Sequence, residues 1–96
     1  MAEKRINGSL PTNGNSAIFF SSGDPLFVSC LGTFGGGTFA VQYRNDAGTW
    51  ATFNAGVVPA LTAPGEILVG DFPANLPLRL NMSGATSPSV TFQAQA

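Results

Sequence analysis

The chain has 96 residues, only 9% of them charged, with a formal net charge of −1 and no histidine. Globular proteins typically carry about 25% charged residues, so the polar surface here must rest mainly on Ser, Thr, Asn and Gln. Four basic residues against five acidic ones exclude nucleic acid and anionic membrane as partners, because both require a basic face. The length fits a single domain.

Targeting and redox signals are absent from the sequence. No apolar run approaches the roughly 20 residues of a membrane-spanning helix. Residues 1–8 lack the hydrophobic core of a signal peptide, so we expect synthesis in a cytoplasm. Cys30 is the single cysteine, which excludes an intrachain disulfide.

The pattern predicts β-strands throughout, because Gly or Pro recurs every few residues and no helical apolar stripe lasts two turns. Residues 1–15 are polar and Gly-rich and are expected to form an N-terminal arm, followed by one β-sandwich domain over residues 16–96. Seven or eight short strands are typical of an antiparallel β-sandwich or jelly-roll-like barrel. The expected strands, the first of them inside the arm, are residues 5–10, 17–20, 26–31, 38–44, 50–53, 66–72, 78–83 and 90–95.

Alternation assigns the inward faces of three strands. Apolar and polar residues alternate in residues 38–44, 78–83 and 90–95, so every second side chain should face the core. Residues 26–31 and 66–72 are more continuously apolar, which predicts strands covered on both faces, with one cover from another subunit as an alternative.

Turn chemistry supports the strand assignment. Residues 45–48 (Asn-Asp-Ala-Gly) predict a short hairpin with Gly48 in a left-handed conformation. Residues 35–37 are three glycines, which permit a turn with positive or negative φ angles. They are not followed by the lysine and helix of a phosphate-binding loop. The longest connection, residues 54–65, is expected to cross from one sheet to the other.

Candidate catalytic groups are few. Without histidine, Ser–His and Cys–His nucleophiles are excluded, and Cys30 is interpreted as a buried small hydrophobe. Asp24 and Asp46 fit turn positions, while Asp71 is expected at the sandwich rim or paired with Arg44 or Arg79. We therefore expect no catalytic residue, metal or cofactor. A hydrolase built on Asp46, Glu66 or Asp71 is a remote alternative.

The aromatic residues are the remaining candidates. Trp50 and Tyr43 are expected in the core or at a subunit interface, with a sugar-stacking platform as the alternative. A surface low in charge and rich in Phe indicates burial against other protein. The expected interface residues are Phe19, Phe20, Phe27, Phe34, Trp50 and Phe53.

Three segments resemble small β-sandwich virion proteins of tailed bacteriophages, which include capsid decoration (cement) proteins and head-fibre attachment domains. These segments are residues 32–43 (GTFGGGTFAVQY), residues 45–50 (NDAGTW) and residues 76–85 (LPLRLNMSGA). The resemblance spans roughly two thirds of the chain, from about Leu31 to the C-terminus, and carries over no catalytic residue.

The resemblance implies a homotrimer on the outer capsid surface, synthesised in the host cytoplasm, that binds the major capsid protein and clamps neighbouring capsomers. The alternative is a module of a phage fibre or tail that binds a host glycan or receptor through Trp50 and Tyr43.

Overall fold

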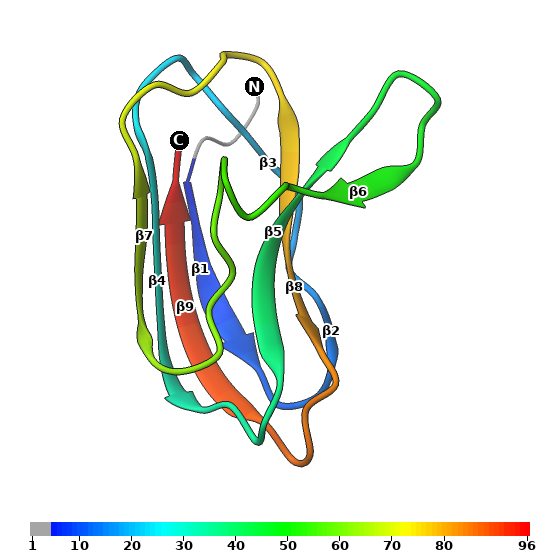
Figure 1. Ribbon diagram of the computed structural model, residues 1–96, viewed down its shortest axis with the longest axis vertical. Helices are drawn as coiled ribbons and strands as arrows, with labels where there is room; N and C mark the ends of the chain where they lie inside the picture. The colour runs from blue at the N-terminus through cyan, green and yellow to red at the C-terminus, as the bar shows by residue number, and fades with distance from the viewer. Residues whose placement is uncertain (1–4) are drawn as a thin grey trace.

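The computed structural model describes residues 5–96, which form nine β-strands and no helix, and therefore no helix that could cross a membrane. The strands pair antiparallel in two sheets that face each other (Figure 1). This confirms the predicted all-β sandwich, with one strand more than expected. The strands are β1 (Arg5–Leu10), β2 (Gly14–Asn15), β3 (Phe19–Phe20), β4 (Leu26–Thr33), β5 (Thr38–Arg44), β6 (Trp50–Thr52), β7 (Gly65–Val69), β8 (Pro77–Ser83) and β9 (Ser89–Gln95).

Sheet A has the strand order β1-β9-β4-β7, and sheet B has the order β2-β8-β5-β6, with β3 also paired to β8. The N-terminal arm expected over residues 1–15 includes β1 and β2, and its residues 1–4 lie outside the described part of the chain. β1 pairs with β9 along six residues, from Arg5 opposite Gln95 to Leu10 opposite Val90. Residues 5–10 are therefore an integral strand of sheet A.

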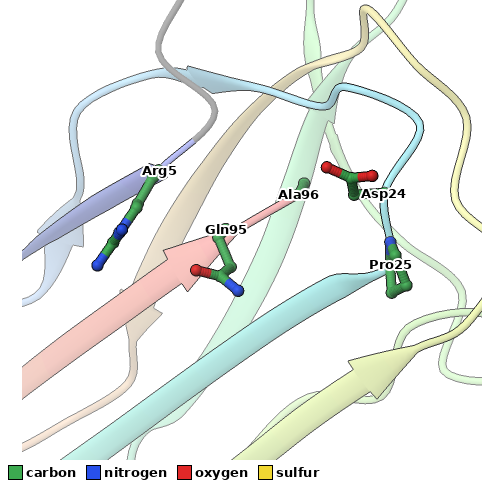
Figure 2. Close-up of a pocket in the computed structure, with 5 residues that line it drawn as sticks. All are labelled: Arg5, Asp24, Pro25, Gln95 and Ala96. Carbon is green, nitrogen blue, oxygen red and sulfur yellow. The ribbon is translucent and has the colours of Figure 1, made fainter.

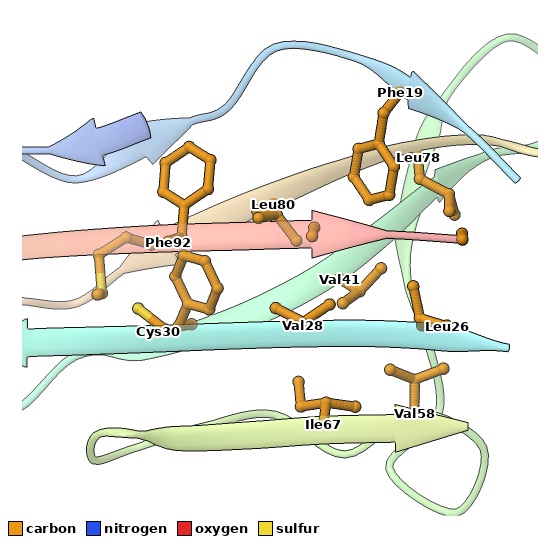
Figure 3. Packing of buried hydrophobic residues seen from close by; sticks show 14 of the residues in the cluster. Phe19, Leu26, Val28, Cys30, Val41, Val58, Ile67, Leu78, Leu80 and Phe92 are labelled. Carbon is orange, nitrogen blue, oxygen red and sulfur yellow. The ribbon is translucent and has the colours of Figure 1, made fainter. Parts of the chain in front are cut away.

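The core lies between the two sheets and follows the predicted alternation (Figure 3). In β8 and β9 every second residue is buried, and β4 buries Cys30 in the same way. Burial of such side chains is worth about 1.5–3 kcal/mol each for the larger aliphatic and aromatic ones. The largest fully buried side chains are Phe19, Phe39, Leu26, Ile67, Leu78, Leu80, Met82, Val28, Val41, Val90 and Cys30.

The strand predicted over residues 66–72 is shorter in the structure and covered on one face only. β7 ends at Val69, and Gly70 and Asp71 lie in the turn that follows. Ile67 is buried, whereas Leu68 on the opposite face is 71% exposed. Within one chain, sheet A therefore leaves apolar side chains uncovered on its outer face.

The turns connect the sheets as predicted. Residues 54–65 run from β6 in sheet B to β7 in sheet A, and Gly48 has φ of 82°. The Asn45 side-chain oxygen accepts hydrogen bonds from the backbone N–H groups of Ala47 and Thr49, which shapes the projecting β5–β6 hairpin (Figure 1). At the opposite end, Thr86 N–H donates to the Gly35 carbonyl, which joins the two turns there.

We expect Val28→Ala to lower the free energy of unfolding by about 2 kcal/mol, because it removes buried methyl groups and leaves a cavity between the sheets. Val57→Ala is the matched control, since Val57 is 55% exposed in a loop, and should change stability by no more than about 0.5 kcal/mol. Urea unfolding followed by far-ultraviolet circular dichroism measures both. Equal losses in the two variants would contradict the assigned core.

A second pair of variants tests the glycine turn. Gly35 and Gly36 both have positive φ, 61° and 79°, but a Cβ at Gly35 would collide with the Thr86 carbonyl, whereas one at Gly36 would meet open space. We expect Gly36→Ala to cost about 1 kcal/mol from backbone strain alone. Gly35→Ala should cost clearly more, because the two turns must separate. A smaller loss for Gly35→Ala in urea unfolding would disprove this docking.

Candidate functional site

The four candidate carboxylates are dispersed over the molecule. Asp24 precedes β4, Asp46 lies at the tip of the β5–β6 hairpin, Glu66 is on β7, and Asp71 follows β7; all four are exposed. No group of three or more His, Cys, Asp or Glu residues in the described part of the chain is arranged to hold a metal ion. Asp71 is exposed in the bend that follows β7, which agrees with the predicted placement at the sandwich rim.

A pocket of about 220 Å³ opens at one end of sheet A (Figure 2). Arg5, Asp24, Pro25, Gln95 and Ala96 line it. Its polar groups are one guanidinium, one carboxylate and one amide, and no thiol or hydroxyl nucleophile is among the lining residues. Because Arg5 and Gln95 also belong to the exposed face of sheet A, the pocket continues that face rather than forming a separate site.

Tyr43 and Trp50 lie on opposite faces of sheet B. The Tyr43 ring packs against Phe53 on the core side, with centroids 4.7 Å apart. Trp50 pairs with Arg44 across β5 and β6 on the outer side, where the Arg79 guanidinium lies 4.5 Å from its ring centroid. The two rings that were considered as a sugar-stacking platform therefore do not form a common surface.

Trp50 belongs to a ladder of polar side chains across sheet B. Arg79 Nε donates to Gln42 Oε1 at 2.7 Å, and Gln42 Nε2 donates to Thr52 Oγ1 at 3.1 Å. Both bonds hold their side chains flat on the outer face, and the cation–π contact adds about 0.5–1 kcal/mol at such a site. This ladder accounts for the half-buried position of Trp50 without a ligand.

The six predicted interface residues do not share one surface. Phe19 and Phe34 are buried in the core of this chain and have almost no surface left for a partner. Phe53 packs against that core and is only partly exposed. Among the partly exposed members, Phe27 is on the outer side of sheet A, while Phe20 and Trp50 are on the outer side of sheet B.

The outer face of sheet A is the strongest candidate for a functional surface. Leu31 and Leu68 on this face are 55% and 71% exposed, and Phe27 lies directly opposite Leu68 in the sheet register. A depression of about 160 Å³ lies near the middle of the face, beside Leu31. We define the outer face of sheet A by its outward-pointing residues, which are Arg5, Asn7, Ser9, Phe27, Ser29, Leu31, Thr33, Glu66, Leu68, Ser89, Thr91, Gln93 and Gln95.

Prediction from the sequence named neither Leu31 nor Leu68 among the interface residues, although it gave cover by another subunit as an alternative for residues 26–31 and 66–72. Both follow a core residue directly, so in a regular alternation each occupies an outward position. The signal was the continuously apolar run itself, because a leucine at an outward position of a strand is not covered by the facing sheet. Leu31 and Leu68 are thus two exposed leucines on one face of the same sheet.

Cys30 is fully buried, and burial raises the pKa of its thiol from 9.0 to about 11. The neutral thiol is thus favoured in the folded state. Ionisation of Cys30 therefore leaves the free energy of unfolding unchanged below pH 9 and lowers it as the pH rises from 9 toward 11. At pH 8 we expect an aromatic disulfide reagent to react with the native chain far more slowly than with the urea-unfolded chain. Equal rates would show that Cys30 is accessible.

The comparisons with known proteins found no relative of this chain. Neither a family model, a curated protein nor a solved structure matches the chain. The functional argument therefore rests on this chain's own surface, and above all on the outer face of sheet A.

Proposed function

We propose that this chain is a non-enzymatic capsid decoration protein of a tailed bacteriophage. It binds the outer capsid surface as an oligomer, with the major capsid protein and further copies of itself as partners, and uses no cofactor. It is made in the host cytoplasm and joins the virion there. The resemblance of its strand-and-turn segments to virion proteins supports this assignment.

One observation carries the proposal. The outer face of sheet A combines exposed Leu31 and Leu68 with uncharged amide and hydroxyl groups, and its charged side chains among the described residues are Arg5 and Glu66 alone. Interfaces between subunits are depleted in charge at their centre in the same way.

The proposed mechanism is thermodynamic linkage. A protein that binds only the assembled shell, and not its separated subunits, stabilises that shell by RT ln(1 + [L]/Kd) for each site. At a free concentration of one hundred times Kd this amounts to about 2.7 kcal/mol per site. Many such sites on one shell oppose the pressure of the packaged genome.

The test measures particles with and without the chain. Virions stripped of the protein should release their genome at a lower temperature than native virions, and adding the purified chain should restore the higher temperature. Light scattering should show an oligomer, and surface labelling of intact particles should reach the chain. A fully monomeric protein that is absent from particles would overturn the proposal.

The same preparation tests the alternative of a glycan-binding module. Trp50 is the only tryptophan, so its fluorescence reports directly on any sugar that stacks on the outer side of sheet B. A decoration protein should show no saccharide-dependent change. A saturable quench with a particular glycan, together with unchanged particle stability, would favour the fibre or tail module instead.

A further inference from the structure

The outer face of sheet B carries positive charge without a carboxylate to balance it. The five strands of this sheet contain Arg44 and Arg79 and no Asp or Glu. The carboxylate nearest to Arg44 along the chain, Asp46, lies at the tip of the β5–β6 hairpin. Neither arginine forms an ion pair with another residue of the described range 5–96. An anionic group on a partner would therefore complement this face.

The register places the two guanidinium groups within reach of one ligand. Arg79 lies directly opposite Gln42, and Arg44 is two residues further along β5. Residues on such a diagonal are about 7–8 Å apart, which long side chains can span. Trp50 borders both arginines, because it pairs with Arg44 and its ring centroid lies 4.5 Å from Cζ of Arg79. The two cations and the indole thus form one continuous patch.

The neutral hydrogen-bonding groups beside the arginines are already bonded within the chain. Gln42 accepts a hydrogen bond from Arg79 Nε and donates one to Thr52 Oγ1. The Arg44 side chain, in contrast, makes no hydrogen bond to another residue in the described part of the chain. The groups left for a ligand are mainly the Arg44 guanidinium and the terminal nitrogens of Arg79. Such charged donors favour a carboxylate over the neutral hydroxyl groups of a sugar.

Apolar side chains border the arginines on the same face. Phe20 lies opposite Pro77, and extending the β5–β8 register by one residue puts Pro77 beside Arg44. Trp50 continues this row on β6. Phe20, Pro77 and Trp50 are each partly exposed. The row therefore offers apolar contact on both sides of a cation, which matches a carboxylate with apolar neighbours in a peptide.

We infer that the outer face of sheet B binds an acidic segment of a partner protein, in which one or two Asp or Glu carboxylates lie between apolar side chains. The carboxylates bind Arg44 and Arg79, and their apolar neighbours pack on Phe20 and Trp50. Arginine suits this role because its planar fork gives a carboxylate two parallel hydrogen bonds. Two charges fit a short acidic segment, whereas nucleic acid and anionic membrane need an extended basic face. The inference concerns a different surface from that of the proposed function and does not depend on it.

The test uses two capped tetrapeptides as probes, Ac-Leu-Glu-Glu-Leu-amide and its neutral counterpart Ac-Leu-Gln-Gln-Leu-amide. Each is titrated into the full chain, and binding is followed by Trp50 fluorescence and by the NMR signals of the indole and guanidinium N–H groups. We expect the glutamate peptide to bind roughly tenfold more tightly than the glutamine peptide, because charge-assisted hydrogen bonds are the stronger ones. Added salt should weaken binding of the glutamate peptide, since exposed charges are screened.

Variants of the two arginines show whether the peptide binds where the structure places it. Arg44→Gln and Arg79→Gln should each weaken binding of the glutamate peptide by roughly tenfold. Arg44→Lys keeps the charge but loses the paired hydrogen bonds, so its loss should be smaller, about threefold. Arg5→Gln, at an exposed position on sheet A, is the matched control and should have no effect. Circular dichroism and the thermal unfolding midpoint check that every variant is folded.

Three results would overturn the inference. The first is equal affinity for the two peptides, or no binding of either. The second is glutamate-peptide binding that neither Arg44→Gln nor Arg79→Gln weakens. The third comes from a galacturonate trimer as a further probe, because an acidic sugar that binds as tightly as the peptide, or more tightly, would indicate a glycan site instead. All these measurements use the free chain, so the decoration function is decided separately, by the stability of particles.

Discussion

The Phe92 ring of sheet A packs against the Phe39 ring of sheet B, and this contact joins the two sheets through the core. Their centroids lie 6.1 Å apart, and Phe34 adds a second ring against Phe39 at 6.5 Å. Gly8 on β1 lies against the Phe92 ring, where a Cβ would come within 3.2 Å of the ring tip. The space left by that glycine lets β1 pair with β9 along its whole length while Phe92 points into the core.

The course of the chain makes this core a product of distant segments. β5 and β6 are the one pair of consecutive strands that also pair with each other in residues 5–96, and most other connections change from one sheet to the other. β1 pairs with β9 across nearly the whole sequence. Such long-range pairing must overcome a large loop-closure entropy before its contacts form. The core is therefore assembled from strands that lie far apart in the sequence.

The alternation in β8 and β9 was sufficient to predict their strands and inward faces, because every second residue there is apolar and every other is polar. The end of β7 was missed, since Phe72 follows Gly70 and Asp71 directly and makes the apolar run look longer than the strand. Sheet order was beyond prediction because it depends on pairing between remote strands. The expected interface residues do not share one surface for a related reason: counting phenylalanines says nothing of the face that each one occupies, and Phe19 lies in the core.

The pairing of β1 with β9 also has a mechanical consequence. Arg5 and Gln95 are opposite each other at one end of the ladder. The start of β1 and the end of β9 therefore lie side by side at the same end of the sandwich (Figure 1). A force that pulls these two ends apart opens the hydrogen bonds of the ladder one after another, whereas a load carried across the sheets acts on the whole core at once. The sandwich is thus weak against peeling from its ends and strong against pressure through its faces.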